Sequence, residues 1–181
     1  MLGDATACQM CERIRPLPNW TCPKCTLSNS HTLWTCAACE ACRLPATVPS
    51  KQTLASCYTF FLFTQQNSRG LKTFINNLRN FLSDNPKSLD GQEVKVVLVS
   101  MDHTCQNAVK CQKLCPEDWY GVPHHASDVR EALVKRVQVN RTDLPVLAVM
   151  GADGRVLNRD VSARVTATGM RANTFWRYVF Q

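Results

Sequence analysis

Beyond residue 54 the chain alternates between two hydrophobic patterns. Ala55 to Phe63 is a continuous apolar run rich in aromatic and β-branched side chains, which is typical of a strand buried on both faces. Leu71 to Asp84 instead carries apolar residues at helical spacing, which share one helical face: Leu71, Phe74, Ile75, Leu78 and Leu82. The two patterns predict a buried strand that leads into an amphipathic helix.

The same alternation continues toward the C-terminus. Val94 to Met101 predicts a second buried strand, and His103 to Leu114 predicts a helix that ends before Pro116. Asp128 to Val137 is a further predicted helix, with Ser127 available as its N-cap. Strands that alternate with helices favour an α/β domain with a partly parallel sheet.

A predicted hairpin follows. Pro145 to Met150 and Arg155 to Leu157 are apolar runs separated by Gly151-Ala152-Asp153-Gly154, which supplies a tight turn. Thr174 to Phe180 is expected to form a last short helix or an ordered tail that covers the sheet. The expected order of strands and helices is that of the thioredoxin core.

Composition changes this picture little. Of 181 residues 45% are hydrophobic, which is enough for most of the chain to fold. Lys and Arg outnumber Asp and Glu by 21 to 14, and residues 46–181 hold 17 of the former against 11 of the latter. Because no basic run concentrates the excess, a solvated surface is the simpler interpretation, and weak attraction to acidic partners is allowed.

The eleven cysteines raise the question of whether the chain resides in an oxidising or a reducing cellular compartment. No apolar signal segment follows Met1 and no stretch is long enough to span a bilayer, so we expect no membrane association and a reducing compartment. Met1 to Thr6 includes Asp4 and no Arg, which is not typical of a mitochondrial presequence. Cytoplasm or nucleus is the default, with a mitochondrial location left open.

Two Cys-x-x-Cys knuckles carry the strongest chemical signal. Cys22 and Cys25 form the first knuckle, and Cys36 and Cys39 form the second. Each knuckle presents two thiolates about one metal ion apart, and the loop between them closes a tetrahedron of four soft ligands. Free or disulfide-bonded cysteines are the alternative, but two knuckles within eighteen residues favour one bound Zn²⁺.

The residues around these knuckles match a known pattern. Trp20 and Asn29 complete Trp-x-Cys-x2-Cys-x3-Asn-x6-Cys-x2-Cys at every fixed position, so the segment resembles the Ran-binding-protein-type zinc finger, also called NZF. The resemblance implies two knuckles on short hairpins, a Trp packed against the site and an Asn that ties the central loop. Such a small finger buries little core, so we expect the metal to supply its folding free energy.

A second metal site is the less favoured possibility. Cys8, Cys11 and Cys42 would supply most of it, with His31 or Cys57 as the fourth ligand. Three thiols without an obvious fourth partner are weaker evidence than four, and unliganded thiols are the alternative. One zinc ion is therefore expected.

A linker separates the finger from the α/β domain. Arg43 to Thr53 contains Pro45 and Pro49 among small and polar residues, which disfavours both helix and sheet. The chain is therefore divided into an N-terminal extension (1–17), the finger (18–44), the linker (45–53) and the α/β domain (54–181).

From Tyr58 onward the chain resembles the tryparedoxin and nucleoredoxin branch of the thioredoxin fold. The resemblance rests on segments in the same order and spacing as in that family: Val94 to Asp102, Asp118 to Pro123, and Asp143 to Leu147 with Asp153-Gly154. It covers about two-thirds of the chain and implies that Pro145 is cis and faces the redox motif. A trans proline that opens a strand is the alternative.

The redox motif is where this sequence departs from the resemblance. That family places Trp-Cys-Pro-Pro-Cys and then Arg-Gly between the first strand and the first helix, and here the position reads Thr64-Gln65-Gln66-Asn67-Ser68-Arg69-Gly70. Disulfide exchange needs an attacking thiolate and a resolving thiol, which Gln65 and Ser68 do not provide. We expect a redox-inactive domain and no enzyme activity, with an atypical thiol oxidoreductase as an alternative.

The leading functional hypothesis is a zinc-binding adaptor or assembly subunit whose finger and scaffold domain bind protein partners. Many NZF fingers bind ubiquitin through Thr-Phe after the first knuckle and a hydrophobic residue in the second, positions occupied here by Thr26, Leu27 and Ala38. These smaller apolar contacts make weak ubiquitin binding an alternative. Trp34 either adds to this surface or packs the loop.

RNA binding is a further alternative, because a subset of related fingers stacks bases on an aromatic side chain and pairs guanine with arginines. The corresponding positions here are Ser30, Thr32 and Leu33, so sequence-specific readout is not expected. General charge still allows the chain to sit in a ribonucleoprotein.

Overall fold

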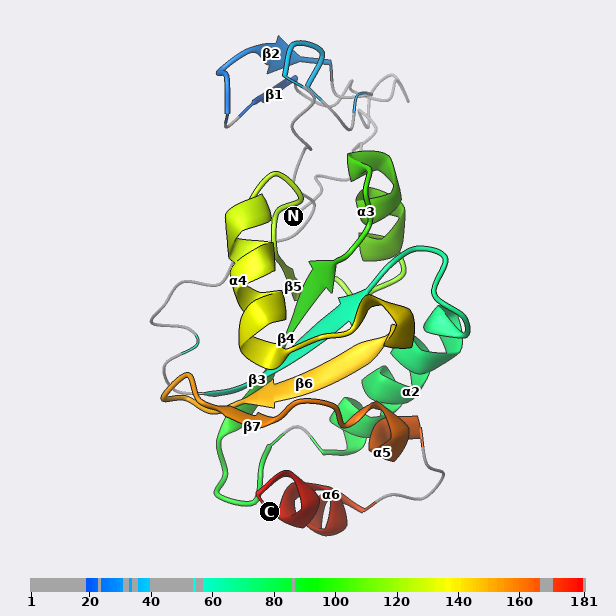
Figure 1. The fold of residues 1–181 in the computed structure, drawn as a ribbon, viewed down its shortest axis with the longest axis vertical. Coiled ribbons are helices and arrows are strands. Elements are labelled where there is room, and N and C mark those ends of the chain that lie inside the picture. The colour runs from blue at the N-terminus through cyan, green and yellow to red at the C-terminus, as the bar shows by residue number, and fades with distance from the viewer. Residues whose placement is uncertain are drawn as a thin grey trace, which may run out of the picture.

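Two separate sheets organise the computed structural model, which describes residues 19–22, 24–30, 33, 36–39, 54, 57–85, 87–166 and 171–180. The smaller sheet is an antiparallel pair of β1 (Trp20–Thr21) and β2 (Ser28–Asn29). The larger sheet has five strands in the order β5-β4-β3-β6-β7 (Figure 1).

The five-stranded sheet is mixed. Its first three strands in this order are mutually parallel, and β6 and β7 are each antiparallel to their neighbours. β3 lies at the centre and all eight of its residues are buried, which explains its continuous apolar sequence. The strand bounds are β3 (Cys57–Thr64), β4 (Glu93–Ser100), β5 (Tyr120–Gly121), β6 (Val146–Met150) and β7 (Val156–Asn158).

Helices α2, α3, α4 and α6 lie where the sequence predicts them, whereas η1 and α5 were not predicted. Their bounds are α2 (Leu71–Asp84), α3 (Cys105–Gln112), α4 (Ser127–Val137), the 3-10 helix η1 (Arg141–Asp143), α5 (Ser162–Thr166) and α6 (Ala172–Val179). The prediction of Ser127 as an N-cap is wrong: Ala126 precedes α4, and its side chain makes no capping bond. Within the described ranges no helix has the length and apolarity needed to cross a bilayer.

Helices cover both faces of the larger sheet (Figure 1). Alternate residues of the three central strands point to one face, where they pack against α2, α5 and α6: Phe60, Leu62, Val96, Leu98, Leu147 and Val149. The intervening residues point to the other face, where they pack with residues of α4: Phe61, Phe63, Val97, Val99, Val146 and Ala148. This two-period alternation gives the domain two cores, one on each face of the sheet.

An aromatic cluster anchors the C-terminal helix to the first core. Phe175 and Trp176 of α6 are fully buried, and the Phe175 ring lies 4.7 Å from that of Phe81 on α2, measured between centroids. Trp176 also contacts Tyr58 at the start of β3, with 5.0 Å between ring centroids. The predicted final helix is thus a structural part of the domain.

The register of β3 against its neighbours fixes what lies at its end. Phe63 pairs with Val146, so Thr64 lies beside Pro145, and the Leu144–Pro145 peptide bond is cis. On the other side Thr64 pairs with Ser100, the last residue of β4. The segment that follows β3 therefore begins at the carboxyl ends of parallel strands, where open α/β sheets usually place their ligand sites.

Candidate metal centre and the loop after β3

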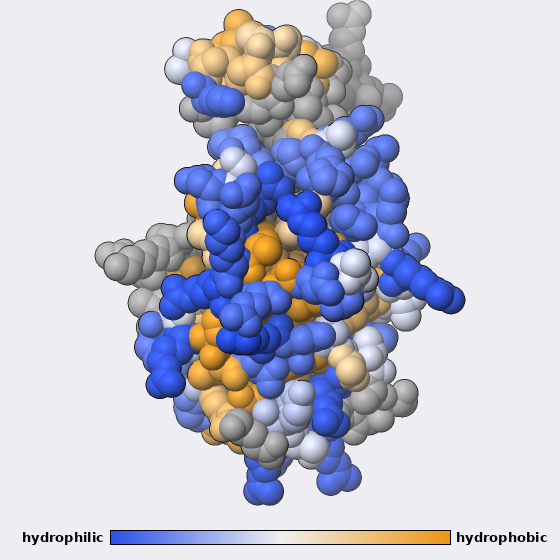
Figure 2. Space-filling view, viewed as in Figure 1, coloured by the Kyte–Doolittle hydropathy of each residue, from blue (hydrophilic) through white to orange (hydrophobic). Residues whose placement is uncertain are grey.

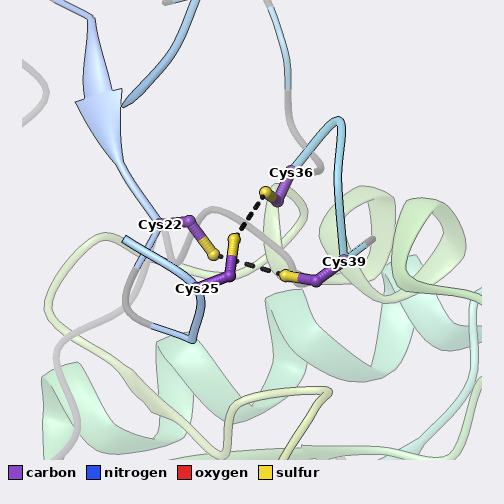
Figure 3. A group of neighbouring side chains, drawn as sticks. All are labelled: Cys22, Cys25, Cys36 and Cys39. Atoms are coloured by element: carbon purple, nitrogen blue, oxygen red, sulfur yellow. Dashed lines mark hydrogen bonds between the residues drawn. The ribbon is translucent and has the colours of Figure 1, made fainter. Parts of the chain in front are cut away.

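The sulfur atoms of four cysteines converge beside the small sheet. Cys22 follows β1, Cys25 lies in the turn after it, and Cys36 and Cys39 flank a second turn (Figure 3). All four Sγ atoms lie within 4.8 Å of one another. The Cys22–Cys39 sulfurs are 3.5 Å apart and the Cys25–Cys36 sulfurs are 3.4 Å apart.

This geometry suits a tetrahedral metal. A zinc ion with four sulfurs at about 2.3 Å implies sulfur–sulfur distances of about 3.8 Å, close to those observed. None of the four cysteines is in a disulfide, so each has a sulfur lone pair to offer. The donor set therefore fits zinc better than a hard cation such as Mg²⁺, which prefers oxygen ligands.

Hydrogen bonds hold the two knuckles in place. The side chain of Asn29 donates to the Leu27 carbonyl at 2.9 Å and accepts from the Ala37 amide at 2.8 Å, so it joins the two turns. The Trp20 indole donates to the Leu33 carbonyl at 2.9 Å. Asn29 is nearly inaccessible to solvent, in keeping with a structural role.

The thiols differ in their affinity for protons. Burial raises the pKa of Cys36, but backbone amides of Cys39 and Ala38 and the Asn29 side chain outweigh burial and lower the pKa to about 6. The backbone near Leu27 lowers the pKa of Cys25, whereas the neighbouring thiols of Cys36 and Cys39 raise it to about 12. Donors aimed at its sulfur thus favour the thiolate at Cys36, the form that binds a metal.

The remaining predicted residues of the finger divide into two groups. Thr26, Leu27 and Ala38 are exposed, and Leu27 exposes 41% of its surface. The Thr26 hydroxyl donates to the Cys25 carbonyl at 2.7 Å. Trp34 and the candidate second-site ligands Cys8, Cys11 and Cys42 lie outside the described residues.

The loop after β3 carries no thiol. Gln65 and Ser68 occupy the two positions where the family resemblance places cysteines. The Ser68 hydroxyl accepts hydrogen bonds from the Gln65 amide and the Thr64 hydroxyl, each at 3.2 Å. Helix α2 begins only at Leu71, after Gly70 with a φ of 72°, so Gln65 lies six residues before the helix.

Asp102 holds this loop from the neighbouring strand. Its carboxylate accepts the Gln66 amide hydrogen, with the two oxygens 3.0 and 3.2 Å from the nitrogen, and also accepts from the Ser100 hydroxyl at 2.9 Å. The His124 ring nitrogen Nε2 is 2.9 Å from the Asp102 carbonyl oxygen. Sequence reasoning missed this role, although a polar residue directly after a buried parallel strand is a usable signal.

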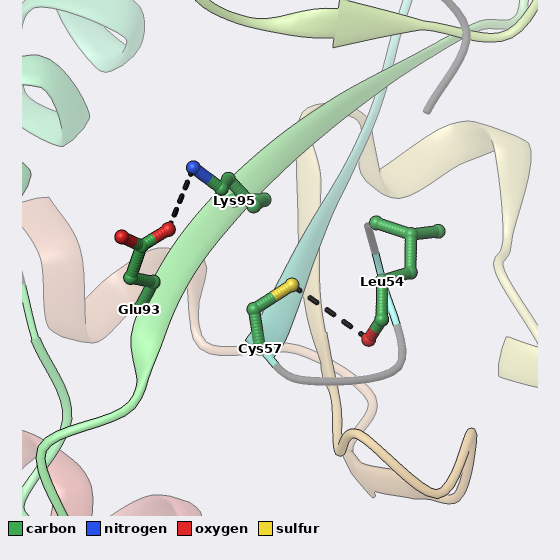
Figure 4. Close-up of polar contacts among 4 residues, drawn as sticks. All are labelled: Leu54, Cys57, Glu93 and Lys95. Atoms are coloured by element: carbon green, nitrogen blue, oxygen red, sulfur yellow. Dashed lines mark hydrogen bonds and ion pairs between the residues drawn. The ribbon is translucent and has the colours of Figure 1, made fainter. Parts of the chain in front are cut away.

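Cys57 lies far from the loop. It begins β3 whereas the loop follows Thr64, which corresponds to roughly 23 Å along the strand at about 3.3 Å per residue. Its thiol donates to the Leu54 carbonyl at 3.7 Å, near the Glu93–Lys95 ion pair of 2.8 Å (Figure 4). Burial raises the pKa of Cys57.

The other cysteines of the domain are on or beside α3. Burial raises the pKa of Cys111 to about 12, and burial with the nearby Cys111 raises the pKa of Cys115 further. Cys105, the first residue of the helix, is disulfide-bonded. Cys57, Cys111 and Cys115 are therefore protonated at neutral pH and weakly nucleophilic.

A sequence profile of the thioredoxin-like family matches residues 57–156, more than half of the chain. The chain therefore belongs to the thioredoxin-like family. No curated protein sequence is similar enough to add a further relative.

Solved structures show the same fold. Tryparedoxin from Trypanosoma brucei is 21% identical, with a TM-score of 0.59 over 70% of this chain and 84% of that one. Thioredoxin from Wuchereria bancrofti is 24% identical, with a TM-score of 0.54 over 71% and 85%. Native tryparedoxin I from Crithidia fasciculata is 22% identical, with a TM-score of 0.54 over 64% and 76%. Likeness at these identities concerns the fold alone.

Proposed function

We propose that this chain is a zinc-binding protein-interaction adaptor. In this proposal an NZF-type finger is folded around one zinc ion and docks on a protein partner. The thioredoxin-like domain carries the finger as a folded scaffold and does not exchange disulfides.

The observation that carries the proposal is the convergence of four sulfurs beside exposed apolar residues. The sulfurs of Cys22, Cys25, Cys36 and Cys39 lie within 4.8 Å of one another, whereas Leu27 and Leu33 expose 41% and 40% of their surface. Figure 2 shows apolar residues gathered on the finger in this view. A small metal-held unit that leaves leucines in water is typical of a docking module, because exposed apolar area is stabilised when a partner covers it.

The loop after β3 supports the second half of the proposal. Thiol–disulfide exchange requires a thiolate and a partner thiol at the same place. Gln65 and Ser68 have neither, and Ser68 uses its hydroxyl to hold the backbone of its own loop. The thiols of Cys57, Cys111 and Cys115 have raised pKa values, so they do not supply the missing thiolate.

Capture of partners from the native cell by the full-length chain tests the docking function. The informative variant is Leu27→Asp, with Leu114→Asp as its matched control, because Leu114 on the other domain is also 41% exposed. We expect a stable partner to be retained by the unaltered chain and by Leu114→Asp, and lost with Leu27→Asp and with Cys36→Ser.

Direct titration with ubiquitin separates docking from the ubiquitin alternative. A small interface with modest apolar area binds in the micromolar range or more weakly, and docking on another partner predicts no detectable ubiquitin binding. Ubiquitin binding that is lost with Leu27→Asp would replace the docking hypothesis by the ubiquitin one. A partner that both Leu27→Asp and Cys36→Ser retain as well as the unaltered chain does would show that the finger is not the docking module.

A further inference from the structure

A cavity whose lining includes three cationic side chains lies beside α4. Its volume is about 190 Å³, and it is lined by the end of β4, by α4 and by η1. The charged and polar lining residues are Ser127, Arg130, Glu131, Lys135 and Arg141, and Met101 and Val134 complete the lining. Three of these side chains are cationic and one is acidic, and Figure 2 shows that the surface over α4 is hydrophilic.

Arg130 is the centre of this cavity. Its Nη1 donates to the Ser100 carbonyl at 3.0 Å, which fixes the guanidinium against the end of β4. Its Nε is buried and has no hydrogen-bond partner. A buried donor without an acceptor is rare in folded proteins and can indicate that a bound ion or water supplies the acceptor.

The guanidinium groups of Arg130 and Arg141 line the same cavity, together with the Glu131 carboxylate. Burial and then the neighbouring Arg141 lower the pKa of Arg130, and these effects exceed the opposing influence of Glu131 and Asp102. Among the residues that the structure describes, neither arginine has a carboxylate oxygen within 4.0 Å. The two like charges therefore repel each other in a partly desolvated place, and an anion between them would relieve this repulsion.

We propose that the cavity between Arg130 and Arg141 binds a small tetrahedral oxyanion of the phosphate type. Guanidinium groups match such anions because their planar N–H groups donate in pairs, and Ser127 adds a hydroxyl donor. The cavity opens to solvent, and its volume of about 190 Å³ accommodates one phosphoryl group. This site is independent of the zinc finger and of the docking function.

Titration of the full-length chain with inorganic phosphate tests the proposal. Amide and arginine side-chain NMR signals are followed at constant ionic strength, with acetate as the planar oxyanion and chloride as the simple anion. The test variant is Arg141→Gln, because Arg141 is exposed. The matched control is Arg177→Gln, an exposed arginine on α6 with the same change of charge.

The expected result is saturable binding of phosphate, with shifts concentrated at Met101, Ser127 and the Nε–H of Arg130. Arg141→Gln should weaken it at least about tenfold, as expected when one of two charge-assisted partners is lost, whereas Arg177→Gln should leave it unchanged. Three results would overturn the proposal: shifts that do not saturate, equal binding by Arg141→Gln, or equal effects of chloride. Acetate binding at least as tightly as phosphate would overturn the tetrahedral assignment.

Discussion

Cysteine has different roles in the two regions of this molecule. In the finger, the sulfurs of Cys22, Cys25, Cys36 and Cys39 gather within 4.8 Å, and amides lower the pKa of Cys36 to about 6. In the thioredoxin-like domain, the thiols of Cys57 and Cys111 are buried, and their pKa values are raised. The surroundings of Cys36 thus favour a metal-binding thiolate, whereas the domain uses buried cysteine as an apolar core residue.

The two regions also differ in what holds them together. The buried apolar residues of the described finger are Cys22 and Cys36, packed with Trp20 and Cys39, which is too little to fold a chain segment of this size. The domain has a core on each face of its sheet. Metal binding is therefore expected to stabilise the first region, and apolar burial stabilises the second.

The largest effect is expected from a substitution that removes a metal ligand from the finger. Cys36→Ser removes one of four ligands, and structural zinc in small fingers supplies about 10–16 kcal/mol of binding free energy that is also folding free energy. We expect residues 20–39 to lose their dispersed amide NMR signals, whereas thermal unfolding of the domain stays unchanged by circular dichroism.

Cys111→Ala is the matched change in the domain. Loss of a buried sulfur is expected to cost about 1 kcal/mol and to lower the melting temperature of the domain by a few degrees, with no effect on the signals of the finger. A finger that keeps its signals after Cys36→Ser would show that packing and hydrogen bonds alone maintain it, contrary to the comparison.

The smallest expected effect is an absence of turnover in an insulin-reduction assay. The unaltered chain should show none above background, because no thiol lies in the loop after β3. The double variant Gln65→Cys with Ser68→Cys should gain little, since position 65 lies six residues before α2 and the helix dipole acts within the first turn. Robust turnover by the unaltered chain that disappears with Cys57→Ser would contradict the proposed loss of activity.

The sequence predicts the long helices and strands of the fold. The apolar spacing of α2 predicts its bounds, Leu71 to Asp84, and the apolar runs of β3, β4 and β6 are confirmed to within two residues. Short elements such as β5 and α5 were missed, because two to five residues do not complete a period that can be recognised. The cap of α4 was misplaced by one residue, a typical uncertainty at helix ends.

The residues of the candidate sites likewise fall into those that the sequence predicts and those that it does not. Cysteine spacing predicts the four clustered sulfurs, since knuckle spacing is a local property of the chain. The hydrogen bond from Gln66 to Asp102 spans 36 residues, and the proximity of Arg130 to Arg141 depends on how α4 and η1 pack. Such contacts follow from tertiary packing and have no local pattern.

The central claim is that the four clustered cysteines hold a zinc ion, and metal analysis of the purified full-length chain tests it most directly. The account predicts one zinc per chain in the unaltered protein and in Cys57→Ser, and none in Cys36→Ser. A reproducible value of two would add Cys8, Cys11 and Cys42 to the ligands. Zinc near zero in protein prepared without chelator, or zinc that Cys36→Ser retains in full, would contradict the account.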